Sequence, residues 1–415
     1  MRRLRGIFYG WWVLVALFIV GAIGPLARFS LAAFFPAISS ELGWSRSIIG
    51  TAQSLSLWAY SFLSILTGWM IDRIGSRKVI FVGGLMCLVG WLLLSRVNSL
   101  WQLYIYYGLV MAVAVSNTHL VPLQATSRKW FVKRAGLAGG IVGSAFSLGT
   151  AVFSPLLTFM SSLYGWRNVS SVAAFVFGVP IMLLAYFVIR DTPESIGQYP
   201  DGTGSLSSAH IQHTSVIQYW NIESVLKTPQ FWLLFVAYGL LGIVFNGLLA
   251  HLVIWAVDLG STTATAGLFV TLFNGPSIIA RVGGGWLADR YGKKRIMVFG
   301  ASLSALMMLL GWQVIHSTNP LIAYIPIFGI GAGFSSILFA PYLGDLFGRR
   351  NIGSLFGILT VAWGLIGGLG PVIWGMIVDA SGSYNAALLM SGICYALALV
   401  MLLLVRPLAE RSAPS

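Results

Sequence analysis

The sequence predicts an all-α membrane protein whose 12 transmembrane helices form two related six-helix bundles. Three observations predict this fold: a very apolar composition, twelve apolar stretches of membrane-spanning length, and an internal repeat that relates the two halves. Of the 415 residues, 57% are hydrophobic and only 9% are charged. A soluble domain carries roughly 25% charged residues, because polar groups must cover its surface. This chain could not cover its surface in water, and it must therefore face lipid.

The apolar stretches give the number of spans. A helix needs about 20 apolar residues to cross a bilayer. Twelve stretches reach that length, at 8–37, 47–71, 78–96, 101–126, 135–163, 168–189, 230–257, 263–287, 295–314, 320–344, 352–378 and 384–405. The first is too long for the core of a signal peptide, so we expect it to be retained as a helix.

The basic residues orient these spans. With both termini on one side, 20 of the 25 lysines and arginines lie on that side, and only Arg46, Arg96 and Arg167 lie on the other. Cytoplasmic loops carry the excess of Lys and Arg. We therefore expect a multi-pass protein of the cytoplasmic (inner) membrane with both termini in the cytoplasm. The same distribution explains the net charge of +14 without nucleic acid as a partner.

An internal repeat divides the chain. A shift of 217 residues superposes the halves, and the matched positions are Leu42-Gly43 on Leu259-Gly260, Gly68-Trp69 on Gly285-Trp286, Asp72-Arg73 on Asp289-Arg290, and Gly136 on Gly353. Six spans per half give both halves the same orientation, so we expect a pseudo-twofold axis along the membrane normal. The predicted domains are an N-terminal bundle at 1–190, a polar cytoplasmic linker at 191–228 and a C-terminal bundle at 229–415.

The loop after the second span of each half carries a recognisable motif. The two copies are Gly68-Trp-Met-Ile-Asp-Arg-Ile-Gly-Ser-Arg-Lys78 and Gly285-Trp-Leu-Ala-Asp-Arg-Tyr-Gly-Lys-Lys-Arg295. Both resemble the loop motif of the major facilitator superfamily, and the resemblance implies the major facilitator fold. It also implies a cytoplasmic gate, in which each aspartate pairs with basic groups and a helix N-terminus. The gate residues would be Gly68, Asp72, Arg73, Gly75, Asp289, Arg290 and Gly292. The alternative is that these charges only reflect the general excess of basic residues in cytoplasmic loops.

Three further stretches resemble a narrower group. They are Tyr9-Gly-Trp-Trp-Val13, Lys129-Trp-Phe-Val-Lys-Arg-Ala-Gly-Leu-Ala-Gly-Gly-Ile-Val-Gly-Ser144 and Arg190-Asp-Thr-Pro-Glu-Ser-Ile-Gly-Gln-Tyr-Pro-Asp-Gly202. Together they look like the monocarboxylate transporters and their bacterial relatives in the oxalate/formate antiporter branch. The resemblance implies alternating-access transport of small monocarboxylates, similar to L-lactate or pyruvate, with proton symport. An oxalate/formate-type exchanger is the alternative. Ser277 stands where the eukaryotic members have an aspartate, and 352–378 lacks the lysine of the oxalate exchanger.

Arg281 is the main candidate for binding an anion. A charged side chain at membrane depth costs about 3 kcal/mol on insertion scales and usually serves a function. Arg281 precedes Asp289 by eight residues, which places it ~12 Å from the cytoplasmic end of its helix. Its repeat counterpart is Ser64, so the duplicated scaffold needs no cation there. A guanidinium can hold a carboxylate with two hydrogen bonds. Snorkelling to the inner interface, or a backbone carbonyl partner, is the alternative.

Two other spans contain isolated polar residues. Arg28 is the second cation within the membrane, either as a gate or substrate contact or close to the outer interface. His251 takes the position of Phe34 in the repeat, on a span expected to line the cavity. It could bind the anion and carry the proton, or it could bond only to a neighbouring helix backbone.

The fourth span offers Asn117 and His119. Residues two apart on a helix point to different faces, so we expect only one of them to face a cavity. We favour Asn117 for substrate binding and keep His119 as a second candidate for proton coupling. Tyr238, Asn246 and Phe334 complete the residues expected to line the cavity.

Other classes of function fit the sequence less well. A membrane enzyme would need clustered His or acidic residues at one interface, and neither such a cluster nor an H-E-x-x-H motif occurs. A channel would not need duplicated gate motifs. We expect no metal and no cofactor, a monomer, and a small monocarboxylate anion, a proton and the lipid bilayer as partners.

Overall fold

Apolar helices make up the computed structural model of the chain, which describes residues 8–44, 46–202, 221–261, 263–266 and 268–406. Eleven helices of this part are long and apolar enough to cross a membrane. The remaining expected span is α15 (Leu268–Tyr291), whose 24 residues extend about 36 Å. Asn274, Pro276 and Arg281 lower its hydropathy. The all-helical fold predicted from the sequence is confirmed.

The N-terminal half contains six spans, several of which are broken into consecutive helices. In chain order the elements are α1 (Gly10–Ile23), α2 (Leu26–Leu42), α3 (Arg46–Ile74), α4 (Ser76–Leu94), α5 (Leu100–Leu103), the π-helix η1 (Tyr104–Val110), α6 (Met111–Ser116), α7 (Leu120–Trp130), α8 (Ala135–Tyr164), α9 (Trp166–Ala173), the π-helix η2 (Ala174–Gly178) and α10 (Val179–Phe187).

The described parts of the linker contain η3 (Pro193–Ile196), η4 (Pro200–Gly202) and α12 (Ile222–Leu226). The Gly/Ser-rich stretch of the predicted linker, from Thr203 on, lies outside the described residues, as do Arg2, Arg3, Arg5 and Arg411 of the topology argument. The C-terminal half consists of α13 (Pro229–Asp258), α14 (Thr263–Ala266), α15, α16 (Lys293–Val314), α17 (Thr318–Ser336), α18 (Phe339–Phe347), α19 (Ile352–Leu365), η5 (Gly367–Leu369), α20 (Gly370–Ser381) and α21 (Asn385–Leu404).

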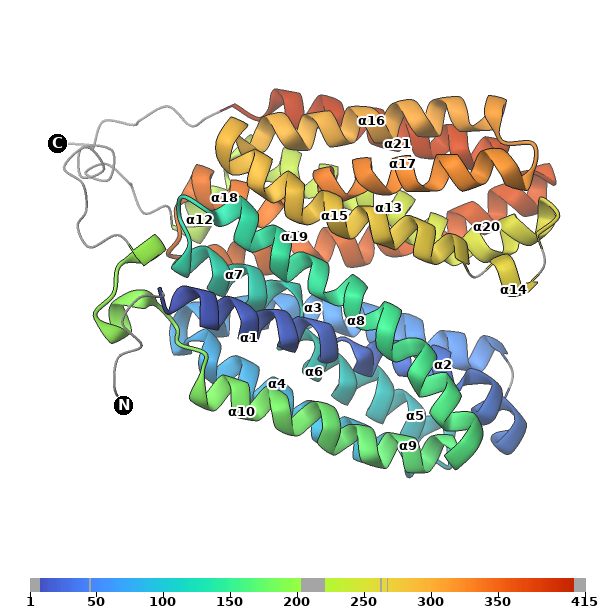
Figure 1. Cartoon of the computed structure of the whole chain (residues 1–415), viewed down its shortest axis with the longest axis horizontal. Coiled ribbons are helices and arrows are strands. Elements are labelled where there is room, and N and C mark those ends of the chain that lie inside the picture. The colour runs from blue at the N-terminus through green and yellow to red at the C-terminus, as the bar shows by residue number, and fades with distance from the viewer. Residues whose placement is uncertain (1–7, 45, 203–220, 262, 267, 407–415) are drawn as a thin grey trace.

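The two halves lie side by side, the first coloured blue to green and the second yellow to red in Figure 1. Each has its own apolar core, with Trp91 in the first and Trp374 in the second. Large apolar side chains such as Phe159 and Ile279 are exposed on the outside, as expected for surfaces in contact with lipid. The start of α1, the end of α21 and α12 lie at one end of the molecule, which we call the linker face.

Glycines bring helices of opposite halves into close contact. A Cβ on Gly140 of α8 would meet the backbone oxygen of Arg281 at 2.2 Å, and a Cβ on Gly357 of α19 would meet that of Ser64 at 2.4 Å. These two contacts are related by the repeat of 217 residues. Only glycine permits this separation, since any side chain would overlap the facing backbone. The two interfaces, α8 with α15 and α3 with α19, frame the space between the halves.

Candidate functional site

A cavity of about 130 Å³ lies between the two halves. One water molecule needs about 10–15 Å³ of cavity volume on the same measure. The cavity is therefore large enough for a small organic ion. Its walls come from both halves, and the residues are Arg28, His119, Leu120, Gln124, Gly143, Phe146, Tyr238, Phe245, Asn246, Leu249, Arg281, Ser336, Ile337, Phe356 and Trp363. Most of this wall is apolar, which leaves a few polar groups to select what binds.

Arg281 reaches the cavity from α15. Its side chain is only 7% exposed. Its Nη1 donates to the backbone oxygen of Gly143 and to Oγ of Ser147, both at 3.0 Å and both on α8 of the other half. The guanidinium therefore has a backbone carbonyl partner and also lines the cavity, which combines two of the alternatives that the sequence left open.

Arg28 lines the same cavity from α2. Its guanidinium lies 5.8 Å from the ring centroid of Tyr60, and its backbone oxygen accepts a hydrogen bond from the Tyr107 hydroxyl. Among the described residues that line the cavity there is no aspartate or glutamate. Two guanidinium groups thus share one small, largely apolar space, an arrangement that attracts an anion.

His119 also lines the cavity, contrary to the preference for Asn117 derived from helical spacing. The helix is interrupted between α6 and α7, and His119 has an extended backbone, with φ −106° and ψ −151°. Helical periodicity does not apply across that break. The amide of Asn117 instead accepts a hydrogen bond from Thr67 at 2.8 Å, and Asn117 is not part of the cavity wall.

The hydrogen bonds of His119 suit it to meet an acceptor. Its Nδ1 lies 3.1 Å from the hydroxyl of Tyr60, and its buried Nε2 has no hydrogen-bond partner in the described structure. When Tyr60 donates to Nδ1, the hydrogen of the neutral ring is on Nε2. Nε2 can then donate to an anion, so His119 adds a hydrogen-bond donor to the two guanidinium groups of the site.

His251 and Phe334 lie outside the cavity. His251 Nε2 is 3.0 Å from the backbone oxygen of Pro371, and its Nδ1 is 3.5 Å from the Tyr384 hydroxyl. Phe334 packs over Gly284 and against Phe299. The expectation that these two side chains line the cavity is wrong for this structure.

The position of His251 follows from the geometry of α13. Tyr238, Phe245 and Leu249 of that helix face the cavity, whereas a residue two positions beyond Leu249 points to another face. Sequence reasoning named Arg28, His119, Tyr238, Asn246 and Arg281 of this wall and missed the other ten residues, among them Gln124 and Trp363. Gln124 was visible as an amide in an apolar span, but an aromatic residue in a chain with 16 tryptophans carries no such signal.

Two repeat-related contacts join the halves at the linker face. Asp289 accepts hydrogen bonds from the backbone N–H groups of Gly136 (2.6 Å) and Leu137 (2.8 Å) at the start of α8. Asp72 accepts from those of Gly353 (3.2 Å) and Ser354 (2.7 Å) at the start of α19. Each carboxylate thus caps the positive end of a helix in the other half. We call these two contacts the latches.

Other residues of the two motif copies make contacts or turns close to the latches. Arg73 lies over the ring of Trp69 at 4.9 Å, and Arg290 lies over that of Tyr291 at 5.7 Å. Gly75 has a φ of +90° and Gly292 a φ of +97°, values that favour glycine because other residues clash there.

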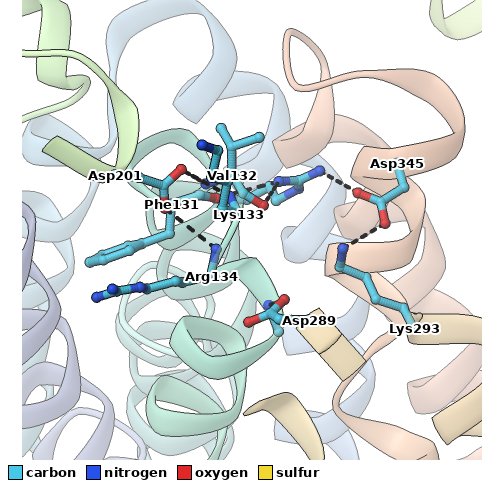
Figure 2. Close-up of polar contacts among 10 residues, drawn as sticks. Phe131, Val132, Lys133, Arg134, Asp201, Asp289, Lys293 and Asp345 are labelled. Atoms are coloured by element: carbon cyan, nitrogen blue, oxygen red, sulfur yellow. Dashed lines mark hydrogen bonds and ion pairs between the residues drawn. The ribbon is translucent and has the colours of Figure 1, made fainter. Parts of the chain in front are cut away.

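An ion-pair network beside the Asp289 latch was not anticipated from the sequence. Arg128 pairs with Asp345 at 2.5 Å across the halves, and Lys293 pairs with the same carboxylate at 2.6 Å (Figure 2). In the same view Asp201 of the linker accepts hydrogen bonds from the backbone N–H groups of Val132 (3.0 Å) and Lys133 (2.9 Å). Arg128 and Asp345 occupy equivalent positions of the repeat. Their pairing depends on how the two halves pack, which the sequence does not show.

Two bundles of membrane-spanning helices, with a cationic cavity between them and the latches on one side, have the architecture of a membrane carrier. The family comparison agrees: the Major Facilitator Superfamily model matches residues 17–264 and 252–415. The chain belongs to this superfamily, and it is a multi-pass membrane transporter, not an enzyme.

Its relatives are distant but cover nearly the whole chain. The oxalate:formate antiporter of Oxalobacter formigenes is 26% identical over 96% of this chain and 91% of its own. Monocarboxylate transporter 13 of Bos taurus is 24% identical over 92% of this chain and 86% of its own. Among solved structures, the proton:xylose symporter XylE matches with a TM-score of 0.78 at 13% identity, over 96% of both chains. This last likeness concerns the fold alone.

Proposed function

We propose that the protein is a secondary active transporter that moves small monocarboxylates, similar to L-lactate or pyruvate, across the cytoplasmic membrane together with a proton. Transport proceeds by alternating access between the two halves, and the linker face is the cytoplasmic side. The proposed binding group is Arg281, assisted by His119, Arg28 and Tyr238. The protein acts as a monomer, and its bundles span 1–190 and 229–415.

The observation that carries this proposal is the pair of guanidinium groups in one small cavity without a carboxylate on its described wall. Burying a guanidinium away from bulk water is costly, and a bound anion offsets that cost. The apolar remainder of the wall, which includes Phe146 and Phe245, suits a short hydrocarbon group. The names of both relatives, the oxalate:formate antiporter and the monocarboxylate transporter, refer to carboxylates.

A second candidate is an organic-anion exchanger of the oxalate/formate type. The specific observation in its favour is that Arg28 and Arg281 line the same cavity, so that a dicarboxylate could engage both. The sequence alone could not place these two arginines together.

Uptake into proteoliposomes tests the proposal. We expect labelled L-lactate to accumulate faster with an inward proton gradient than without one. Liposomes without protein provide the background, and liposomes preloaded with oxalate or formate test for exchange. Uptake that requires an internal anion and ignores the proton gradient would favour the exchanger. Absence of both lactate uptake and oxalate exchange would contradict transport of carboxylates.

The two candidate proton carriers can be separated by matched substitutions. Because His119 lines the cavity and His251 does not, we expect His119→Gln to lose most of the acceleration by a proton gradient, with exchange of lactate retained. We expect His251→Gln to keep that acceleration. The measurement is the ratio of initial uptake rates with and without the gradient. The opposite pattern would assign coupling to His251, and no change in either variant would leave the proton to travel with the substrate.

A further inference from the structure

We propose that Ser147 is a positioning residue that holds Arg281 so that one edge of its guanidinium stays available for a carboxylate. This inference rests on the proposed function and deepens it. Ser147 does not line the cavity itself, so it acts through Arg281.

The hydrogen bonds of Arg281 occupy one of its nitrogens and leave another without a partner. Nη1 is occupied by Gly143 and Ser147, each at 3.0 Å. Nε is buried and has no hydrogen-bond partner among the described residues. Nε and Nη2 form the edge of a guanidinium that presents two parallel N–H groups to a carboxylate. Fixing Nη1 on α8 therefore orients this edge. A buried donor without a partner costs free energy, and binding of an acceptor such as a carboxylate removes that cost.

The Arg281–Ser147 pair has no counterpart at the repeat-related interface. At the repeat-related interface, Arg281 is replaced by Ser64 and Ser147 by Gly364. The space beside Gly364 is filled by Ser61, whose Oγ lies 1.5 Å from where a Cβ would be. Both interfaces pack tightly, but only one carries the arginine–serine pair. Packing of the two halves therefore does not require this pair, which points to a role in binding.

The contact also links affinity to conformation. Arg281 is on α15 and Ser147 is on α8, and these helices belong to opposite halves. The edge of the guanidinium is fixed only while the two helices touch. Opening of the linker face separates the halves and releases Arg281, so we expect the anion to bind more weakly in the state open to the linker side. Such a difference between states is what a carrier needs to release its substrate.

The test is the concentration dependence of labelled L-lactate uptake in proteoliposomes, with oxalate exchange used in the same way if lactate is not carried. We expect Ser147→Ala to raise KM about tenfold, because a hydrogen bond to a charged group is lost, with a maximal rate within about twofold of wild type. Ser147→Gly, which also lacks the hydroxyl, should show the same rise in KM. Both variants lack the hydroxyl but differ in side-chain volume. Equal KM values would therefore assign the effect to loss of the hydroxyl and not to a local packing defect.

Ser144→Ala is the matched control. Ser144 is buried on the same helix, but its hydroxyl bonds only to Ile141 of that helix, at 2.8 Å. We expect its KM to match wild type. Wild-type KM in both Ser147 variants, or an equal rise in Ser144→Ala, would overturn the positioning role. If Arg281→Ala also transports normally, the proposed function fails as well; if Arg281→Ala is inactive, only the role of Ser147 is rejected.

Discussion

Arg281→Ala is expected to lower lactate uptake at least about 30-fold, because removal of one partner from a buried, hydrogen-bonded charge pair costs about 2–5 kcal/mol. Arg281→Lys should recover little, since an ammonium group cannot present two parallel N–H donors or hold the contacts to Gly143 and Ser147 at once. The measurement is initial uptake into proteoliposomes at equal protein content.

Ser64→Ala is the control for this result. Ser64 is the repeat counterpart of Arg281, and its hydroxyl donates a hydrogen bond within its own helix, to the backbone oxygen of Tyr60 at 2.8 Å. We expect this variant to keep near-wild-type uptake and both variants to insert and melt like wild type. Normal uptake by Arg281→Ala would remove the anion site from this position.

The double variant Asp72→Asn/Asp289→Asn should open the linker face. Each aspartate accepts two backbone hydrogen bonds from a helix start in the other half. An asparagine retains one carbonyl oxygen but brings an NH₂ group against those donors. We expect each substitution to shift the equilibrium between closed and open states about tenfold, on the scale of hydrogen bonds to charged groups. The free energies of the two independent contacts add, so the double variant should shift the equilibrium about 100-fold.

This shift can be measured as accessibility to a membrane-impermeant thiol reagent. The label site is Ser336→Cys, at the wall of the cavity, in a background with Cys87→Ser and Cys394→Ser. Reagent supplied from the linker side should react faster in the double variant. Asp191→Asn is the control. Asp191, the first residue of the linker, also accepts a hydrogen bond from a helix start, the N–H of Arg77 at 2.8 Å, but this contact does not join the two halves. Equal labelling of the double variant and wild type would contradict the role of the latches.

The composition, the apolar spans and the repeat were sufficient to predict the helical membrane fold, because the membrane allows few ways to satisfy a backbone. The two motif copies also predicted which carboxylates lie at the linker face. Their partners, the helix starts at Gly136 and Gly353, are among the glycines that the repeat aligns. Whether these contacts act as latches stays a prediction for the experiment above.

The site was less predictable. Arg281 could be selected from sequence, because a lone cation in an apolar helix is costly and therefore conspicuous. The choice between Asn117 and His119 could not be made in this way, since the helix breaks between them and His119 takes an extended backbone. His251 was the first candidate for proton coupling, but the face of α13 on which it lies packs against Pro371 and Tyr384.

The sequence by itself thus determined the class of fold and the residues that are expensive to bury, since both follow from the transfer of side chains and backbone into lipid. Only the tertiary structure decided which of these residues share one cavity. Arg28 and Arg281 are far apart in sequence and on opposite halves, and Ser147 gains its significance solely from the contact between α8 and α15. Such proximity depends on how two bundles pack, and a pattern within a single helix carries no information about the helix that it will face.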